Sequence, residues 1–433
     1  MNFDMMHPAE QIVMIMDRIY KYGMTTTSGG NLSIMDSDGD IWITPGGIDK
    51  GSLTVEDIIQ IKPDGTIIGR HKPSSELPFH RALIHHRKGT KAVLHAHPPA
   101  LVAFSIVRQN PKTDITTELF RLYQRGGIKM AKYEIPGSEL LGDRILEVFK
   151  ENINTVMLEN HGVVIASDNL FDAFKIFETL EFGARLEINS RILGEPKSLT
   201  AEDYEVATNT QMPPELSDYD DHITTSYEKK ERAKMCNFVK RAYQQRLFSS
   251  TQGTYSRRIA GNAFIITPFD KDRMYLEPDD IVAVNAEGMR EKGKIPSRSV
   301  RLHEEIYKMH PEINSVIIAY PPNVMAFAIT DHEFDSRTIP ESYIMLRDIP
   351  RLLFHTAYSE PKTVANAISE STPVIMVQNS CIITTGSSML QAYDRLEVAE
   401  FSAKALIFSK QLGDIVPISQ QQVEEINESF HLK

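Results

Sequence analysis

The sequence predicts an α/β fold that occurs twice in the chain, and two observations carry this prediction. Each half alternates segments of helical periodicity with short apolar runs that are typical of buried strands. The halves also match one another in one register, since residues 53–58 match 276–281 and residues 100–106 match 323–329. A single long period indicates a tandem duplication of one domain, not a solenoid of short repeats.

The first half is expected to begin with a helix from about residue 9 to residue 22, because its apolar side chains recur at helical spacing. Gly29 and Gly30 then break the chain direction. Residues 31–34 and 40–44 flank a Ser-Asp-Gly turn, which is the pattern of a β-hairpin. The hairpin places Asn31 at the start of a strand.

Further along, a second helix is expected from about residue 75 to residue 87, followed by a short apolar strand at residues 92–94. Residues 155–166 are rich in strand-forming side chains. Residues 170–193 have the apolar spacing of a long helix. Together these segments form one α/β unit.

We place the first domain at residues 1–195 and the second at residues 229–433. Residues 196–228 lie between them and are polar and acidic, with a Pro-Pro pair. This composition fits either a linker or an ordered segment that wraps a domain.

The composition excludes several classes of protein. The chain has 433 residues and 41% hydrophobic content, enough for two domains with cores of their own. A net charge of -11 argues against nucleic acid as a partner. Only Cys236 and Cys381 are present, so no disulfide framework is expected. Neither a signal peptide nor an apolar membrane span is evident. We therefore expect a cytoplasmic protein with no membrane partner.

Two histidines at the tip of an expected strand are the first candidate metal ligands. His95 and His97 are one residue apart, and alternate side chains of a strand share a face. Two prolines follow directly and end the strand. In the second half Ile318 and Tyr320 stand in their places. The alternative is a pair of capped or surface histidines.

A third histidine, His161, lies in an apolar segment that is expected to be a strand. The alternative for this residue is a buried histidine satisfied by a backbone carbonyl. Ser380 replaces it in the second half, whereas Asn160 keeps its counterpart in Asn379. Three histidines lost together are explained most simply if they served one ion. Three histidines with a fourth position open are typical of catalytic zinc.

A Pro-Ser-Ser-Glu segment supplies further candidates. Ser74 and Ser75 are suited to cap the helix expected from Glu76. A helix N-terminus with free hydroxyl and N–H groups also suits an anion, although capping alone would explain the serines. In the second half Arg298 and Ser299 replace the second serine and the glutamate, so these groups are lost with the histidines.

Two glycine-containing turns, at residues 29–31 and 45–47, present backbone N–H groups that suit a phosphate. The alternative is that they are only turns. Their counterparts in the second half have lost most of the glycines.

These motifs, in this order and spacing, resemble the class II aldolase/adducin family, which includes fuculose-phosphate aldolase. The resemblance covers about residues 8–195, and the second half is similar but lacks the ligands. The motifs are Gly30-Asn31-Leu32-Ser33, Ile43-Thr44-Pro45-Gly46-Gly47, Lys72-Pro73-Ser74-Ser75-Glu76, His95-Ala96-His97 and Glu159-Asn160-His161-Gly162.

The resemblance implies a tandem pair of αβα three-layer domains with one metal ion per chain. The implied ligands are His95, His97 and His161, and zinc is the default ion for such ligands, with another divalent transition metal as the alternative. Glu76 is implied to act as the acid/base beside the metal. The phosphate site is implied to consist of Asn31, Gly46, Gly47, Ser74 and Ser75.

Such a site suits the cleavage of a ketose phosphate, such as a fuculose-1-phosphate-like sugar, to dihydroxyacetone phosphate and an aldehyde. The ion would stabilise the enediolate, and Glu76 would carry the proton to or from its carbon. A pentulose-phosphate 4-epimerase or a sugar-acid-phosphate decarboxylase would use the same chemistry. A non-enzymatic, adducin-like interaction module is the alternative from another class.

The family's aldolases also have a tyrosine that reaches into the site from a neighbouring subunit. The aligned position is Phe120 in the first half and Tyr343 in the second. We expect the metal-free domain to donate Tyr343 to a metal-bearing domain beside it, the alternative being an ordinary packing aromatic. By analogy with fourfold rings of single-domain members, we expect a homo-oligomer, either a dimer that forms a pseudo-fourfold ring or a higher assembly.

Overall fold

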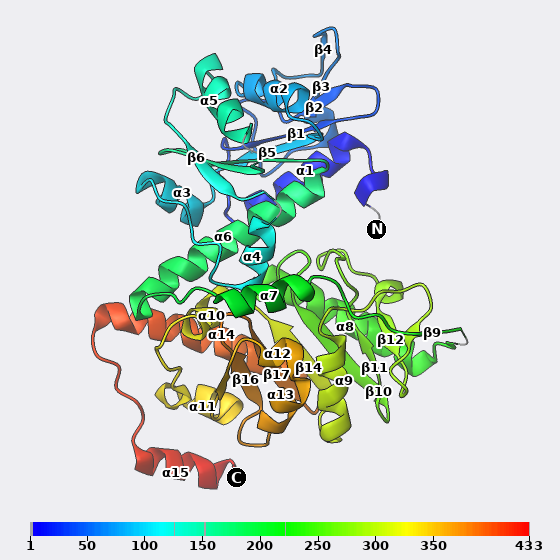
Figure 1. The fold of residues 1–433 in the computed structure, drawn as a ribbon, viewed down its shortest axis with the longest axis vertical. Helices are drawn as coiled ribbons and strands as arrows, with labels where there is room; N and C mark the ends of the chain where they lie inside the picture. Colours follow the sequence, from blue (N-terminus) through cyan, green and yellow to red (C-terminus); the bar gives the residue numbers. More distant parts are fainter. Residues whose placement is uncertain (1–2, 125, 151–152, 221, 433) are drawn as a thin grey trace. The chain divides into compact units, whose positions relative to one another are not determined.

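A computed structural model describes residues 3–124, 126–150, 153–220 and 222–432 (Figure 1). The chain forms two compact bodies. The N-terminal body contains Asn2–Thr113 and Leu122–Arg185, and the C-terminal body contains Asp114–Arg121 and Leu186–Lys433. Residues 114–121 of the first half therefore belong to the same body as the second half, which the order of the sequence did not predict.

The N-terminal body is built on an eight-stranded sheet with the order β4-β3-β2-β1-β5-β8-β7-β6. Neighbouring strands are antiparallel except β6 and β7, which are parallel. The strands are β1 (Asn31–Met35), β2 (Ile41–Ile43), β3 (Ile59–Ile61), β4 (Ile67–Ile68), β5 (Ala92–Ala96), β6 (Ile128–Ala131), β7 (Thr155–Leu158) and β8 (Val163–Ser167).

Helices cover both faces of this sheet, so the body has three layers (Figure 1). Helices α2 and α5 share a core with the strands on one face, and α1 packs on the other face. The helices of this body are α1 (Pro8–Lys21), α2 (Leu77–His86), α3 (Pro99–Ile106), α5 (Glu139–Phe149) and the first part of α6 (Leu170–Leu193), with short 3-10 helices at Phe3–Met5 and Val55–Asp57. Most of α4 (Thr117–Tyr123) and the end of α6 belong to the C-terminal body. The helices expected near residues 9–22, 75–87 and 170–193 are thus confirmed within two residues at each end.

The C-terminal body is built on a nine-stranded sheet with the order β15-β16-β17-β14-β10-β11-β12-β13-β9. Its strands are β9 (Asp218–Tyr219), β10 (Thr254–Ala260), β11 (Ala263–Ile266), β12 (Val282–Val284), β13 (Arg290–Glu291), β14 (Ser315–Ala319), β15 (Arg351–Leu352), β16 (Val374–Val377) and β17 (Cys381–Gly386). Strands β10 to β17 repeat the order and connectivity of β1 to β8, which confirms the duplication of the fold.

The helices of the C-terminal body repeat the same plan, with α7 and α15 added at the ends and the short α12 added before α13. They are α7 (Ala201–Asn209), α8 (Ser226–Gln244), α9 (Val300–Met309), α10 (Pro322–Ala328), α11 (Pro340–Leu346), α12 (Thr356–Ser359), α13 (Pro361–Ala367), α14 (Met389–Leu412) and α15 (Gln420–Ser429), with 3-10 helices at Pro278–Asp280 and Ser336–Thr338. Helix α7 and strand β9 lie within residues 196–228, and β9 pairs in parallel with β13.

Within the described ranges, every helix is too short or too polar to cross a lipid bilayer.

Candidate metal centre

His95 is fixed in its ring orientation by a backbone hydrogen bond. It is the fourth residue of β5, is fully buried, and its Nδ1 lies 3.0 Å from the carbonyl oxygen of Val163 on β8. Donation from Nδ1 to that carbonyl places the lone pair on Nε2, which is the tautomer a metal ligand needs.

His97 lies one residue beyond the strand that the sequence predicted for it, since β5 ends at Ala96. Pro98 has an extended conformation and precedes helix α3, so the chain turns directly after the histidine. Gly29 approaches this side chain closely: a Cβ atom there would lie 3.0 Å from His97 Nδ1. Gly29 is therefore required by the close approach to the ring, and not only by a turn.

His161 lies in the tight turn between β7 and β8, not on a strand, which corrects the expectation. Asn160 occupies the left-handed region with φ 55°, and the N–H of His161 donates to Leu158 O at 3.1 Å. A Cβ atom on Gly162 would lie 2.5 Å from Ala96 O and 2.7 Å from His97 Cδ2. Glycine at this position lets the turn approach the end of β5, which brings the third ring to the other two.

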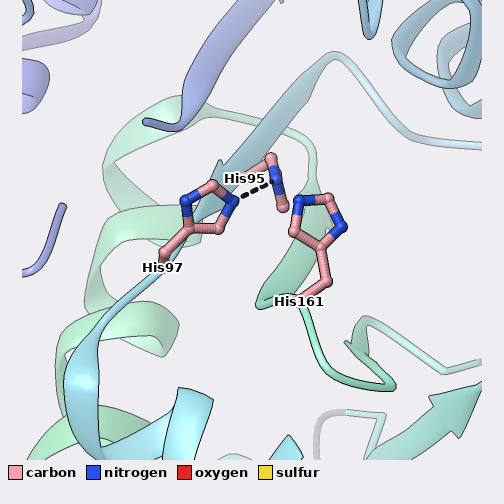
Figure 2. Close-up of side chains that lie close together, drawn as sticks. All are labelled: His95, His97 and His161. Atoms are coloured by element: carbon pink, nitrogen blue, oxygen red, sulfur yellow. Dashed lines mark hydrogen bonds between the residues drawn. The ribbon is translucent and has the colours of Figure 1, made fainter. Parts of the chain in front are cut away.

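The three imidazoles converge (Figure 2). One ligand atom from each of His95, His97 and His161 lies within 4.8 Å of the others, and the Nε2 atoms of His95 and His97 are 3.0 Å apart. Burial and the neighbouring imidazoles lower the pKa values of His95 and His97 to about 3, and burial lowers the pKa of His161. Neutral imidazoles with converging nitrogens fit a divalent metal ion.

Glu76 closes one side of the histidine cluster. Its Oε2 lies 3.3 Å from His95 Nε2, and its Oε1 lies 3.9 Å from His161 Nε2. The side chain is buried, and Oε1 has no hydrogen-bond partner among the described residues. The sequence predicted that Glu76 would start the helix, but it is the N-cap residue of α2 and the helix begins at Leu77.

A chain of buried hydrogen bonds holds Glu76 in place. Asn31 donates its Nδ2 hydrogen to Glu76 Oε2 at 2.7 Å, and its Oδ1 lies 2.5 Å from His80 Nε2. His80 Nδ1 lies in turn 2.7 Å from Ser33 Oγ. Sequence reasoning missed Ser33 and His80 as parts of the site. The one available signal was that His80 lies one helical turn after Glu76, but His303 matches it in the second half, which indicated a scaffold residue.

Asn31 begins strand β1, and the other four candidate phosphate residues lie on two adjacent loops of the same body. An isolated bridge between Pro45 and Pro73 brings residues 45–47 beside residues 73–75. Gly47 has φ 69° and open space around its α-carbon, and Ser75 is exposed. Gly46 already donates its N–H to Lys72 O, and Ser74 Oγ accepts from Glu76 N at 3.2 Å. Gly47 and Ser75 are therefore the more available groups.

A buried lysine also braces this loop. Lys50 donates to Pro45 O at 2.6 Å, and burial lowers its pKa. No cation beside this loop was predicted from the sequence. Arg273, its counterpart in the second half, is also buried and donates to Gly253 O at 3.0 Å. Because both halves keep a cation bound to loop carbonyls, Lys50 shapes the loop and is not specific to the metal-bearing half.

Tyr343 and Phe120 both belong to the C-terminal body, whereas the histidine cluster belongs to the N-terminal body. Tyr343 lies on α11, is 8% exposed and donates to Asn427 Oδ1 at 3.1 Å. Phe120 stacks on Tyr204 with 4.5 Å between the ring centroids. The described contacts of Tyr343 are thus those of a packed aromatic within its own body.

Comparison with known proteins gives a family and several relatives. The chain is 30% identical over 198 residues to a 5-deoxy-D-ribulose 1-phosphate aldolase of Bacillus thuringiensis, covering 45% of this chain and 91% of that protein. It is 34% identical over 173 residues to an L-fuculose phosphate aldolase of Methanococcus maripaludis. That match covers 40% of this chain and 89% of the aldolase. It is 28% identical over 179 residues to a 3-oxo-tetronate 4-phosphate decarboxylase of Escherichia coli. That match covers 41% of this chain and 84% of the decarboxylase.

The family model described as "Class II Aldolase and Adducin N-terminal domain" matches the chain twice, at residues 10–188 and 233–407. The two matches correspond to the two sheets and cover both halves of the duplication. The chain therefore belongs to the class II aldolase and adducin family, with one copy of the domain in each half.

Proposed function

We propose that this chain is a metal-dependent class II aldolase that cleaves a ketose phosphate to dihydroxyacetone phosphate and an aldehyde. The observation that carries the proposal is the convergence of three neutral imidazole nitrogens beside a buried carboxylate oxygen that has no hydrogen-bond partner in the described parts of the chain. His95, His97 and His161 would hold the ion, for which zinc is the default. A divalent ion held there supplies positive charge that stabilises an enediolate.

Glu76 is the residue we assign to proton transfer. Asn31 holds one of its oxygens, so the other, Oε1, is directed and remains available to a substrate proton. A positioned carboxylate of this kind exchanges a proton with the carbon of the enediolate. Because both polar atoms of the Asn31 amide are engaged, we assign Asn31 to orienting Glu76, and we assign phosphate binding to Gly47 N–H and Ser75.

Two other reactions use the same enediolate chemistry. One relative is a 3-oxo-tetronate 4-phosphate decarboxylase, so decarboxylation of a sugar-acid phosphate is the second candidate. A pentulose-phosphate 4-epimerase is the third. The non-enzymatic interaction module fits less well, because such a module has no need of a buried carboxylate directed at three imidazoles.

A substrate screen tests the proposal. The full chain is incubated with ketose 1-phosphates and release of dihydroxyacetone phosphate is followed, with release of carbon dioxide from 3-oxo-tetronate 4-phosphate measured in parallel. We expect cleavage that stops with a chelator and returns with zinc. Glu76→Gln should lower kcat by about 100-fold or more. Ser299→Ala, the matched change in the second half, should leave kcat unchanged. Turnover that resists the chelator would contradict the mechanism.

Tyr343 is proposed to complete a metal site on a neighbouring copy, in an oligomer that includes at least two chains. Tyr343→Phe should lower kcat while metal content stays normal. Tyr204→Phe, which changes a packed tyrosine of the same body, is the control. Unchanged turnover of Tyr343→Phe at normal metal content would remove Tyr343 from the mechanism.

A further inference from the structure

Thr25 carries a buried hydroxyl group that has no hydrogen-bond partner among the described residues. The residue is 8% exposed and lies between α1 and β1, in the body that holds the histidine cluster. A buried hydroxyl without a partner lowers stability, because it has lost its hydrogen bonds to water and gained none within the protein. A valine of nearly the same shape would avoid this cost, so the hydroxyl of Thr25 requires an explanation.

The hydroxyl lies beside the metal ligand His97. A Cβ atom on Gly29 would lie 3.0 Å from Thr25 Oγ1 and 3.0 Å from His97 Nδ1, so the two polar atoms are at most twice this distance apart. A Cβ atom on Gly30 would lie 3.2 Å from Thr25 Oγ1 and 2.9 Å from His95 O. The two glycines therefore let Thr25 approach the end of β5, where both histidines lie.

His97 has one ring nitrogen that the ligand set does not use. Its Nε2 lies 3.0 Å from His95 Nε2, and the other nitrogen, Nδ1, points away from His95 and His161 (Figure 2). A neutral imidazole that binds a metal through Nε2 carries its proton on Nδ1 and nearly always donates it to an acceptor. For His95 this acceptor is Val163 O. The described hydrogen bonds of the His97 ring involve Nε2 alone, so its Nδ1 is available to a partner.

The second half has a phenyl ring in the place of this hydroxyl. The register that aligns Gly30 with Gly253 aligns Thr25 with Phe248. A Cβ atom on Gly253 would lie 2.3 Å from Phe248 Cδ1, so the aligned side chains occupy matching places in the two halves. Phe248 is 2% exposed, and Tyr320 replaces the histidine. This position is buried in both halves but carries a hydroxyl only where a histidine lies beside it.

Thr26 also lies close to His97, but it is a weaker candidate for the partner of Nδ1. A Cβ atom on Gly29 would lie 2.9 Å from Thr26 Oγ1. Thr26 is exposed, so water can satisfy its hydroxyl. Its counterpart Ser249 keeps a hydroxyl in the half that lacks the histidines. Thr26 therefore provides a matched control for Thr25.

We propose that Thr25 is a positioning residue for His97: Thr25 Oγ1 accepts a hydrogen bond from His97 Nδ1 when a divalent ion is bound by the cluster. This hydrogen bond keeps the proton on Nδ1, leaves the lone pair of Nε2 to the ion and fixes the plane of the ring. The buried hydroxyl and the free ring nitrogen then satisfy one another. The inference rests on the metal centre of the proposed function, but not on the reaction assigned to it.

The proposal predicts that one substitution affects metal affinity without lowering stability. Thr25→Val removes the hydroxyl and keeps nearly the same shape. The Tm of the metal-stripped chain should stay the same or rise, because a buried group without a partner is removed. The affinity for zinc should fall about tenfold or more, as is typical when the partner of a metal-bound histidine is lost. Thr25→Ser keeps the hydroxyl and should bind zinc as the wild type does.

Isothermal titration calorimetry of zinc into the metal-stripped full chain tests the proposal, with thermal unfolding of the same samples. The wild type, Thr25→Ser and Thr26→Val should bind zinc alike, and Thr25→Val should bind it about tenfold or more weakly. Equal affinity in Thr25→Val and the wild type overturns the proposal, as does a loss of affinity that Thr25→Ser or Thr26→Val shares.

Two other outcomes are distinguished by the same samples. A lower Tm of metal-stripped Thr25→Val would attribute its weaker zinc binding to disturbed packing, and would overturn the role of the hydroxyl. A wild-type chain that binds no zinc would contradict the metal centre of the proposed function and this inference with it. Zinc binding by the wild type with no effect of Thr25→Val overturns the inference alone.

Discussion

Gly162→Ala is the change whose effect on the metal centre follows most directly from the geometry. A Cβ atom at residue 162 would lie 2.5 Å from Ala96 O and 2.7 Å from His97 Cδ2, whereas ordinary contact begins at 3.4 Å. The turn or the end of β5 must therefore move by about 0.9 Å. Metal–ligand distances tolerate only about 0.2 Å.

We expect Gly162→Ala to bind the ion about 10- to 100-fold more weakly, because one of three ligands is displaced, and overpacking should cost roughly 1–3 kcal/mol of unfolding free energy. Gly142→Ala is the matched control, since its nearest neighbour would lie at 3.6 Å, within ordinary contact. Metal affinity by calorimetry and Tm by thermal unfolding provide the readout. Wild-type metal affinity in Gly162→Ala would refute the claim that close approach of the turn builds the site.

Three further predictions concern other parts of the chain. Arg298→Ser should lower the unfolding free energy of the C-terminal body by about 2 kcal/mol, because the carboxylate of Glu118 loses one of its two ion pairs and keeps only the pair with Arg121. Thermal unfolding measures this change, and an unchanged Tm would contradict the prediction. Burial raises the pKa of Glu400 to about 7, above its ordinary value, so the stability of the chain should fall as the pH rises from about 4.5 to about 7. Glu400→Gln should flatten this pH dependence in thermal melts. The same change of Tm with pH in Glu400→Gln and in the wild type would contradict the prediction. His80→Ala and His303→Ala should lower the unfolding free energy by similar amounts, because each histidine contacts a serine of its own half. Only His80→Ala should lower kcat, by about tenfold or more. Equal kcat in the two variants would contradict the role of His80 in holding Asn31 and Glu76.

The histidine cluster could be predicted from the sequence because the duplication supplied an internal comparison. His95 and His97 are separated by one residue in a strand pattern, and none of the three histidines has a histidine counterpart in the second half. What the sequence could not give was the turn that carries His161, since a short apolar run does not distinguish a strand from the hairpin turn within it. Proximity of this turn to β5 depends on pairing between strands distant in sequence.

The chain of hydrogen bonds behind Glu76 was not predicted for a similar reason. Ser33 and His80 are far apart in the sequence and meet only when β1 and α2 pack together. Both halves keep this serine–histidine contact, since Ser256 Oγ lies 2.7 Å from His303 Nδ1. What differs is Asn31, whose counterpart Thr254 leaves His303 Nε2 without a partner among the described residues. A residue-by-residue comparison of the halves shows that Asn31 is absent from the second half, but it does not show that Asn31 contacts Glu76 and His80.

The place of residues 114–121 could not be predicted either. Sequence order assigns them to the first half, and nothing in their composition indicates that Glu118 pairs with Arg298. Contacts of this kind depend on tertiary packing, which a single sequence does not reveal.

We expect the chain to hold one metal ion, bound by the histidines of the first half. Metal analysis of the full chain by inductively coupled plasma mass spectrometry tests this most directly, with His97→Tyr as the variant that copies the residue of the second half. We predict one ion per wild-type chain and none in His97→Tyr. Two ions per chain, none in the wild type, or an ion retained by His97→Tyr would contradict the claim.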